Sequence, residues 1–185
     1  MQSNDIMNYS VREGLRNGRT VTIRAVRPDD KGRMVDALLE VSPESLYRRT
    51  FSAKRNLTED DLKHLTDVDF ENVVALVAVI MEEGQDRIVG GGRYVRLGSS
   101  GIAPKAEVAF LIDDAHQGQG IGSRIFNHLV VIARASRIAQ FEAEVLPSNE
   151  GMLRLFMHSG LPISRTTSRD SVHVTIDLTE VEKDV

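Results

Sequence analysis

The chain has 185 residues, of which 41% are hydrophobic and 27% are charged, and it contains no cysteine. Its 23 Lys and Arg against 27 Asp and Glu give a net charge of −4, which disfavours a whole-domain grip on nucleic acid because phosphates need a basic surface. The missing cysteines exclude disulfides, thiol nucleophiles and thiolate metal sites. No apolar run is long enough to span a bilayer and the first residues do not form a secretory signal, so we expect a cytoplasmic protein.

The N-terminal third reads as a hairpin followed by helices. Residues 8–16 and 19–26 flank Asn17-Gly18, a pair that favours a β-hairpin with a type I′ turn. Pro28-Asp29-Asp30 suits the first turn of a helix, which Ser42-Pro43 interrupts. Two further helices are expected, one from Glu44 to Arg49 and one starting at Thr58, where TEDD resembles a capping box.

The remainder alternates between strands and helices. The apolar runs at 73–80 and 87–97 predict two paired strands with a turn at Glu83-Gly84, and Gly90-Gly91-Gly92 permits a bulge or a close backbone approach. Further elements are strands at 105–112 and 140–146, a helix after 113–122, a helix starting at Asn149, and a hairpin across Ser168-Arg169-Asp170. We therefore expect an α+β fold on a mixed, largely antiparallel sheet.

One segment carries a sharper signal. From Ala106 to Arg124 the pattern is strand, glycine-rich loop, helix, and such a loop presents backbone N–H groups at the positive end of a helix dipole, which suits a phosphate. A P-loop would need Lys after the last glycine, and Ser123 stands there instead. A dinucleotide GxGxxG fingerprint would need glycine at the same position. Neither motif fits.

The sequence QGQGIG at 117–122 matches QxxGxG and resembles the pyrophosphate-binding signature of the GNAT superfamily of acyl-CoA N-acyltransferases. The predicted element order over about residues 20–178 is also similar to that superfamily. The segments SPESLYRRTFS, AEVAFLIDDAHQGQGIGSRI and AEVLPSNEGMLRLF look like the acetyltransferase domain of bacterial protein-lysine acetyltransferases that modify acyl-CoA synthetases. The resemblance implies a GNAT-type fold, with residues 1–18 as an N-terminal strand or hairpin arm, 19–180 as a single N-acetyltransferase domain and 181–185 as a tail.

The resemblance further implies acetyl-CoA as acyl donor and no metal. The loop amides would hold the pyrophosphate, the main chain of Phe110 to Ile112 would pair with the pantetheine arm, and Asn149 would contact the cofactor or act as a plain helix N-cap. Many superfamily members carry a Tyr seven residues after that Asn as general acid, where this chain has Phe156, so no acid is assigned. The expected cofactor-binding set is Phe110, Leu111, Ile112, Gln117, Gly118, Gln119, Gly120, Ile121, Gly122, Ser123, Asn149 and Phe156.

Acyl transfer to an amine needs an acceptor for the amine's proton, and Glu107 is our candidate for this general base. A charged residue in an otherwise apolar central strand is costly to bury without a role. The matching Glu in the lysine-acetyltransferase group is the general base, often acting through water. The alternative is a structural carboxylate paired with Arg93 or Arg96, and Glu142 and Glu144 are reserve candidates.

The five His residues show no HxxxH or HExxH spacing, so metal binding is not expected, and His116 beside the loop reads as a surface residue. The predicted activity is acetyl-CoA-dependent N-acetylation of a protein lysine, with an acyl-CoA synthetase as candidate partner, by a monomer or homodimer without nucleic acid or membrane partners. Two alternatives stay open: a small-molecule amine or amino-acid N-acetyltransferase, and a non-catalytic acyl-CoA-binding module.

Overall fold

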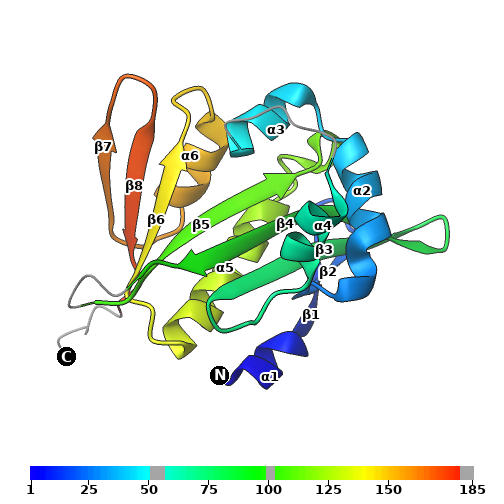
Figure 1. Ribbon diagram of the computed structural model, residues 1–185. Coiled ribbons are helices and arrows are strands. Elements are labelled where there is room, and N and C mark those ends of the chain that lie inside the picture. Colours follow the sequence, from blue (N-terminus) through cyan, green and yellow to red (C-terminus); the bar gives the residue numbers. More distant parts are fainter. Residues whose placement is uncertain (51–56, 99–102, 180–185) are drawn as a thin grey trace.

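The computed structural model describes residues 1–50, 57–98 and 103–179, and it forms one mixed sheet of eight strands with helices on both faces (Figure 1). The strand order is β1-β2-β3-β4-β5-β6-β8-β7, and only β5 and β6 are parallel, which confirms the predicted α+β class. The strands are β1 (Ser10–Gly14), β2 (Thr20–Ala25), β3 (Val73–Glu82), β4 (Gln85–Arg96), β5 (Lys105–Ile112), β6 (Gln140–Val145), β7 (Ile163–Thr167) and β8 (Val172–Asp177).

The helices match the predicted ones, with one addition at the N-terminus. They are α1 (Ser3–Met7), the 3-10 turn η1 (Pro28–Asp30), α2 (Lys31–Leu39), α3 (Pro43–Thr50), α4 (Glu59–Thr66), the 3-10 turn η2 (Asp114–His116), α5 (Ile121–Ala135) and α6 (Glu150–Met157). The capping box predicted at Thr58 is present, with Asp61 as its partner. Within the described residues, no helix combines the length and the apolar character that a membrane span requires.

The N-terminal residues belong to the same core as the rest of the sheet. The side chain of Ile6, on the unpredicted α1, is only 1% exposed. Tyr9 hydrogen-bonds through its hydroxyl to Nδ1 of His128 on α5 at 2.5 Å. β1 continues the sheet as the edge strand beside β2. Residues 1–18 are therefore joined to the domain by burial and by strand pairing, and the predicted tail at 181–185 lies outside the described residues.

The hairpin predicted at Asn17-Gly18 exists, but its type I′ turn was wrong. Of the pair only Gly18 has a positive φ, +80°, and Leu15 donates its N–H to the carbonyl of Arg19 at 2.7 Å. The connection is therefore a longer loop that ends in a left-handed glycine. The two positive φ angles of a type I′ turn occur instead between β3 and β4, at Glu83 (+49°) and Gly84 (+79°).

The glycines of β4 allow the helix on one face to approach the sheet, as expected. A Cβ on Gly92 would lie 2.4 Å from Cδ1 of Phe110 and 2.7 Å from Cγ2 of Ile125 on α5. The strand also bulges, because Ala78 pairs with Gly90 whereas Val79 pairs with Ile88, which leaves Val89 as an extra residue. α2, α3 and α4 lie over the opposite face (Figure 1).

A buried ion pair fixes the start of α2 to β2. Asp30 is fully buried and accepts two hydrogen bonds of 2.7 Å from the guanidinium of Arg24, whose side chain is 7% exposed. Asp30 also accepts from the N–H of Arg27 at 2.9 Å and from Arg33 at 3.0 Å. Burial raises the pKa of the Asp30 carboxyl, but these hydrogen bonds together outweigh burial and hold the pKa below its usual value. The carboxylate is therefore ionised near neutrality and anchors α2 over the sheet.

We predict that Asp30→Ala lowers the free energy of unfolding by about 3–5 kcal/mol, because it strands the buried Arg24 guanidinium without a counter-charge. The measurement is urea unfolding at neutral pH. The matched control is Asp29→Ala, since Asp29 is exposed and has no side-chain hydrogen bond or ion pair among the described residues; its effect should stay within about 0.5 kcal/mol. Equal effects of the two substitutions would contradict the prediction.

Candidate active site

β5 and β6 pair over a short stretch and then separate. Their parallel register covers Lys105 with Gln140, Ala106 with Phe141, and Glu107 with Glu142. Beyond that point β6 pairs only with β8, while residues 108–112 pair only with β4. One edge of β5 from Val108 to Ile112 therefore has backbone N–H and C=O groups without a neighbouring strand. Such an edge can accept an extended ligand chain as an added strand.

A loop rich in glycine follows β5, and we call residues 117–123 the glycine loop. Gly118 and Gly120 have φ angles of +74° and +83° and so adopt the left-handed region. Gly120 is the N-cap of α5, and a Cβ there would lie 2.8 Å from the Arg124 guanidinium. The N–H groups of residues 118–123 donate to no acceptor within the described residues. Unpaired amides at the positive end of a helix suit an anion.

The glycine loop and the open edge of β5 line one cavity of about 460 Å³, which we call the loop cavity. Asn149 also lines this cavity. It is the N-cap of α6 as well, because its Oδ1 accepts from the N–H of Met152 at 3.1 Å. One residue therefore caps the helix and faces the cavity. Ten of the twelve expected cofactor-binding residues line this cavity: Phe110, Leu111, Ile112, Gln117, Gly118, Gly120, Ile121, Gly122, Ser123 and Asn149.

The other two expected cofactor residues lie elsewhere. Phe156 is 1% exposed and packs edge-on against Phe110 and Phe126, with ring centroids 6.2 and 5.6 Å away. Its ring is therefore part of the core under the open edge of β5. Gln119 turns away from the cavity, because its Nε2 donates to Ala115 O at 3.1 Å and its Oε1 accepts from Asn17 at 2.9 Å.

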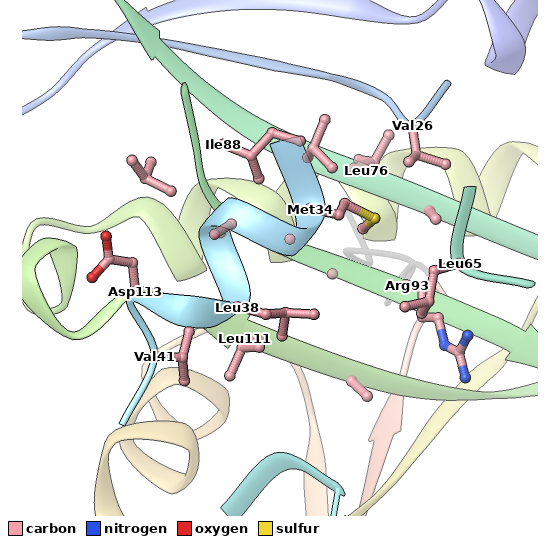
Figure 2. A pocket seen from close by; sticks show the side chains of 18 of the residues that line it. Val26, Met34, Leu38, Val41, Leu65, Leu76, Ile88, Arg93, Leu111 and Asp113 are labelled. Atoms are coloured by element: carbon pink, nitrogen blue, oxygen red, sulfur yellow. The ribbon is translucent and has the colours of Figure 1, made fainter. Parts of the chain in front are cut away.

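A second cavity, of about 370 Å³, lies between the sheet and the helices α2 and α4; we call it the helix cavity (Figure 2). Most of its lining is aliphatic, and its polar lining side chains are Asp61, His64, Arg93 and Asp113. Leu111 lines both cavities, so the two meet at the C-terminal half of β5. An extended ligand along β5 would therefore pass the residue at which the two cavities adjoin.

Glu107 lies on the helix-cavity side of β5, because side chains alternate along a strand and Ala109 and Leu111 line that cavity. We expected the side chain of Glu107 to be buried at a cost, and this was wrong because Glu107 is exposed. Its carboxylate makes no hydrogen bond or ion pair with any described residue, and the expected alternative partners Arg93 and Arg96 form none with it either. It stands at the last paired position before β5 and β6 separate.

The reserve carboxylates, by contrast, are engaged. Glu142 accepts from Nζ of Lys105 at 2.7 Å, and Glu144 pairs with His173 at 2.6 Å. Arg96, the alternative partner of Glu107, donates to the carbonyls of Glu71 and Ser136, both at 2.8 Å. Among Glu107, Glu142 and Glu144, only Glu107 has no partner within the described residues.

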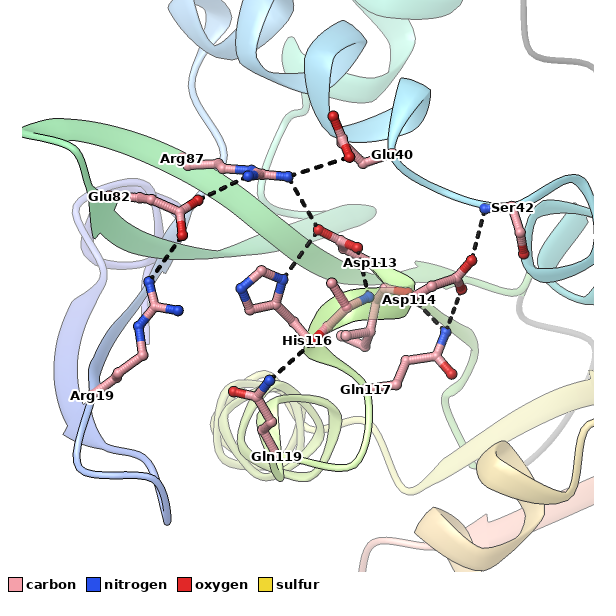
Figure 3. Close-up of polar contacts among 12 residues, drawn as sticks. Arg19, Glu40, Ser42, Glu82, Arg87, Asp113, Asp114, His116, Gln117 and Gln119 are labelled. Atoms are coloured by element: carbon pink, nitrogen blue, oxygen red, sulfur yellow. Dashed lines mark hydrogen bonds and ion pairs between the residues drawn. The ribbon is translucent and has the colours of Figure 1, made fainter.

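A polar network that sequence reasoning missed supports the glycine loop (Figure 3). His116 was expected at the surface, but it is 6% exposed, and its Nδ1 donates to Oδ2 of the buried Asp113 at 3.1 Å. Arg87 on β4 reaches the same carboxylate at 3.4 Å. Asp113 lines the helix cavity and His116 the loop cavity, so the network bridges them. The signal in the sequence was an Asp directly after β5 followed by His three residues later.

A second carboxylate joins the glycine loop to α3. Asp114 accepts from Ser42 N at 2.9 Å and from Ser45 Oγ at 2.5 Å, and Gln117 Nε2 donates to the same carboxylate at 2.8 Å. Gln117 also donates to Ile112 O at 3.1 Å, which closes the turn after β5. No group of His, Asp or Glu in the described part of the chain is arranged to hold a metal ion.

The site thus combines two diverging parallel strands, an exposed edge on one of them and a glycine loop with unpaired amides at its end. These features are typical of a domain for a phosphate-bearing cofactor with an extended arm. A profile of the Acetyltransferase (GNAT) family matches residues 40–161, and the chain belongs to this family. Members of this family are acetyltransferases, and the acyl donor of the family is acetyl-CoA.

The relatives agree with this assignment. The chain is 35% identical over 146 residues to Acetyltransferase Pat of Mycolicibacterium smegmatis, covering 79% of this chain and 42% of the relative. It is 30% identical over 140 residues to Acetyltransferase PA5475 of Pseudomonas aeruginosa, covering 76% and 74%. The crystal structure of the GNAT domain of S. lividans PAT superposes with a TM-score of 0.81 at 36% identity, over 91% of this chain and 96% of that one. The chain thus spans less than half of the Mycolicibacterium relative.

We predict that Gly122→Asp lowers the affinity for CoA by at least about a hundredfold, because a carboxylate beside the free amides repels the pyrophosphate. The fold should persist, since Asp suits the second position of a helix and the nearest atom to a new Cβ is the flexible Leu155 Cδ1 at 3.0 Å. The measurement is calorimetric titration with CoA. Gly32→Asp is the matched control, because Gly32 is the exposed second residue of α2 with open space around it. Unchanged affinity in a folded Gly122→Asp variant would refute the anion site.

Proposed function

We propose that this acetyltransferase moves the acetyl group of acetyl-CoA to the side-chain amine of a protein lysine, with Glu107 as the general base. The observation that carries the proposal is the meeting of the loop cavity and the helix cavity at Leu111, with the partner-free Glu107 on the same face of β5. The donor and the acceptor can then approach one another from the two cavities at the point where β5 separates from β6.

The glycine loop suits the pyrophosphate of the cofactor, and the free edge of Val108–Ile112 suits the amide groups of its pantetheine arm. This arrangement brings the thioester toward Leu111 and Ala109. Glu107 lies two residues before Ala109 on the same face of β5, which is a distance of about 7 Å along the strand. That separation favours proton transfer through a bridging water rather than direct contact.

The reaction is a direct attack. The neutral amine nitrogen forms a bond to the thioester carbonyl carbon, and the tetrahedral intermediate collapses with cleavage of the carbon–sulfur bond. The proton lost by the amine passes to the Glu107 carboxylate, and CoA leaves as its thiolate. A free lysine has a pKa of about 10.4 and is mostly charged at neutral pH, so an acceptor for this proton is required.

The chain shows no proton donor for the departing sulfur at the position where many relatives carry Tyr. Phe156 stands there and is buried among aromatic rings, so it neither reaches the loop cavity nor carries a proton. A thiol has a pKa of about 8.5, which allows the thiolate to leave without prior protonation. We therefore assign no general acid.

The lining of the helix cavity favours a lysine side chain over a polar small molecule. Its walls are largely aliphatic and suit the methylene stem of lysine, while the exposed Glu107 is open to the amine at the tip. A small amine or amino acid would need polar partners for its remaining groups. The resemblance to lysine acetyltransferases that modify acyl-CoA synthetases points to the same acceptor class, and to a cytoplasmic reaction.

We predict that Glu107→Gln lowers turnover by roughly 10²–10⁴-fold with CoA affinity nearly unchanged, because Gln keeps the size of the side chain but cannot accept a proton. Stability should change by less than about 0.5 kcal/mol, since the carboxylate is exposed and has no partner among the described residues. Turnover and melting temperature are measured on the same preparation. The control Glu142→Gln alters the adjacent carboxylate on the same face. Near-normal turnover of Glu107→Gln would eliminate Glu107 as the base.

The acceptor class is tested with a panel of purified acyl-CoA synthetases and small amines incubated with acetyl-CoA. We expect release of CoA thiol with a synthetase, and a mass increase on one of its lysines, at a rate at least about tenfold above that with any small amine, which corresponds to about 1.4 kcal/mol of barrier. The Glu107→Gln variant should abolish both signals. Thiol release with small amines alone would favour the small-molecule alternative, and CoA binding without any transfer would favour the non-catalytic module.

A further inference from the structure

The turn between β1 and β2 is fixed to the glycine loop and to α5, although more than a hundred residues separate them in sequence. Asn17 Nδ2 donates to Gln119 Oε1 at 2.9 Å. Arg124 on α5 donates through Nη2 to the carbonyl of Gly14 at 2.6 Å. The Nε of Arg124 also lies 2.9 Å from Glu13 Oε2, as an ion pair rather than an aligned hydrogen bond. The end of β1 and the turn residue Asn17 therefore hold the turn beside the glycine loop.

This turn brings one cation to the rim of the loop cavity. Arg16 is exposed, lines that cavity, and makes no hydrogen bond or ion pair with any described residue. The other basic side chains of the cavity are engaged. His116 binds Asp113, Arg154 pairs with Glu150 at 3.0 Å, and His158 Nδ1 bonds to the carbonyl of Arg154 at 2.8 Å.

Arg124, the basic residue closest in sequence to the glycine loop, is not available for the cofactor either. Its guanidinium is shared among Glu13, Gly14 and the carbonyl of Gly120, the last at 3.2 Å. Arg124 therefore positions the hairpin and the loop. Arg16 is left as the cavity-lining guanidinium that the described residues do not neutralise.

We propose that Arg16 binds the 3′-phosphate of the CoA adenosine and makes the protein select CoA over dephospho-CoA. The proposal rests on the proposed function only in its use of CoA, not in its acceptor. If the pantetheine arm lies along β5 and the pyrophosphate on the loop amides, the adenosine leaves the loop on the side away from β5. The β1–β2 turn lies against the outer part of the loop, through the contact of Asn17 with Gln119.

The chemistry of the two groups matches. A terminal phosphate carries up to two charges at its exposed end, and the planar guanidinium can bind two of its oxygens at once. A backbone amide cannot offer a full charge, so the pyrophosphate and the 3′-phosphate would be bound by different means. Removing Arg16 should therefore affect one phosphate and spare the other.

The experiment is calorimetric titration of the wild type and Arg16→Ala with CoA and with dephospho-CoA, which lacks only the 3′-phosphate. We expect the wild type to bind CoA at least about tenfold more tightly than dephospho-CoA, as a charge-assisted bidentate contact implies. Arg16→Ala should lose this preference and bind dephospho-CoA as the wild type does. Arg12→Ala is the control, because Arg12 is also exposed, lies on β1, carries the same charge and lines neither cavity.

Three outcomes would overturn the proposal. Equal losses for both ligands in Arg16→Ala would place Arg16 on the pyrophosphate. An unchanged preference for CoA would remove Arg16 from the cofactor site, and equal losses in Arg12→Ala would reduce the effect to net charge. Failure of the wild type to bind either ligand would instead refute the use of CoA, on which the proposed function also depends, and so the two failures are distinguishable.

Discussion

The separation of β5 and β6 after a single short parallel ladder is the constraint on which the rest of the site depends. Parallel strands normally satisfy one another's backbone groups along their length, and here the pairing ends at Glu107 and Glu142. The aromatic cluster of Phe110, Phe126 and Phe156 fills the space beneath the opening, with α6 contributing the last of the three rings. Core packing therefore keeps the two strands apart and leaves the edge of β5 accessible.

In the proposed function, the glycine loop lets a chain with a net charge of −4 bind a polyanionic cofactor. The attraction would be local and come from the unpaired amides of residues 118–123 at the start of α5, which present partial positive charges at short range. The two carboxylates nearest the loop are both engaged. Asp113 accepts from His116 and pairs with Arg87, and Asp114 accepts from Ser42 N, Ser45 and Gln117. Both carboxylates thereby tie the loop to neighbouring elements.

Local pattern predicted the elements well and the contacts between distant segments poorly. The apolar run at 73–80, the capping box at Thr58 and the Asn-initiated α6 depend on neighbours within a few residues, and the structure confirms all three. The turn at Asn17-Gly18 was located correctly but mistyped, because the bonding of Leu15 with Arg19 adds a residue to the loop.

Burial of single polar residues depends on packing that no local window contains. Glu107 was expected to be buried in the central strand. It is exposed instead, and no described residue covers its carboxylate. His116 was expected at the surface and is buried, with its Nδ1 bonded to Asp113, a carboxylate that Arg87 on β4 also contacts. The contact of Asn17 with Gln119, which orients the hairpin turn, likewise spans most of the chain and left no periodic signal.

The attachment of the N-terminal hairpin to the glycine loop makes cofactor binding and local folding one equilibrium. A ligand held by both the loop amides and Arg16 binds more tightly while the hairpin is docked, so it stabilises the docked state by mass action. With the tenfold preference proposed for Arg16, a saturating ligand adds about 1.4 kcal/mol against opening of the edge strand. The N-terminal residues would then exchange their amide hydrogens more slowly, and resist proteases longer, as the acyl-CoA concentration rises. The local stability of the edge strand β1 would therefore rise with the concentration of the acyl donor.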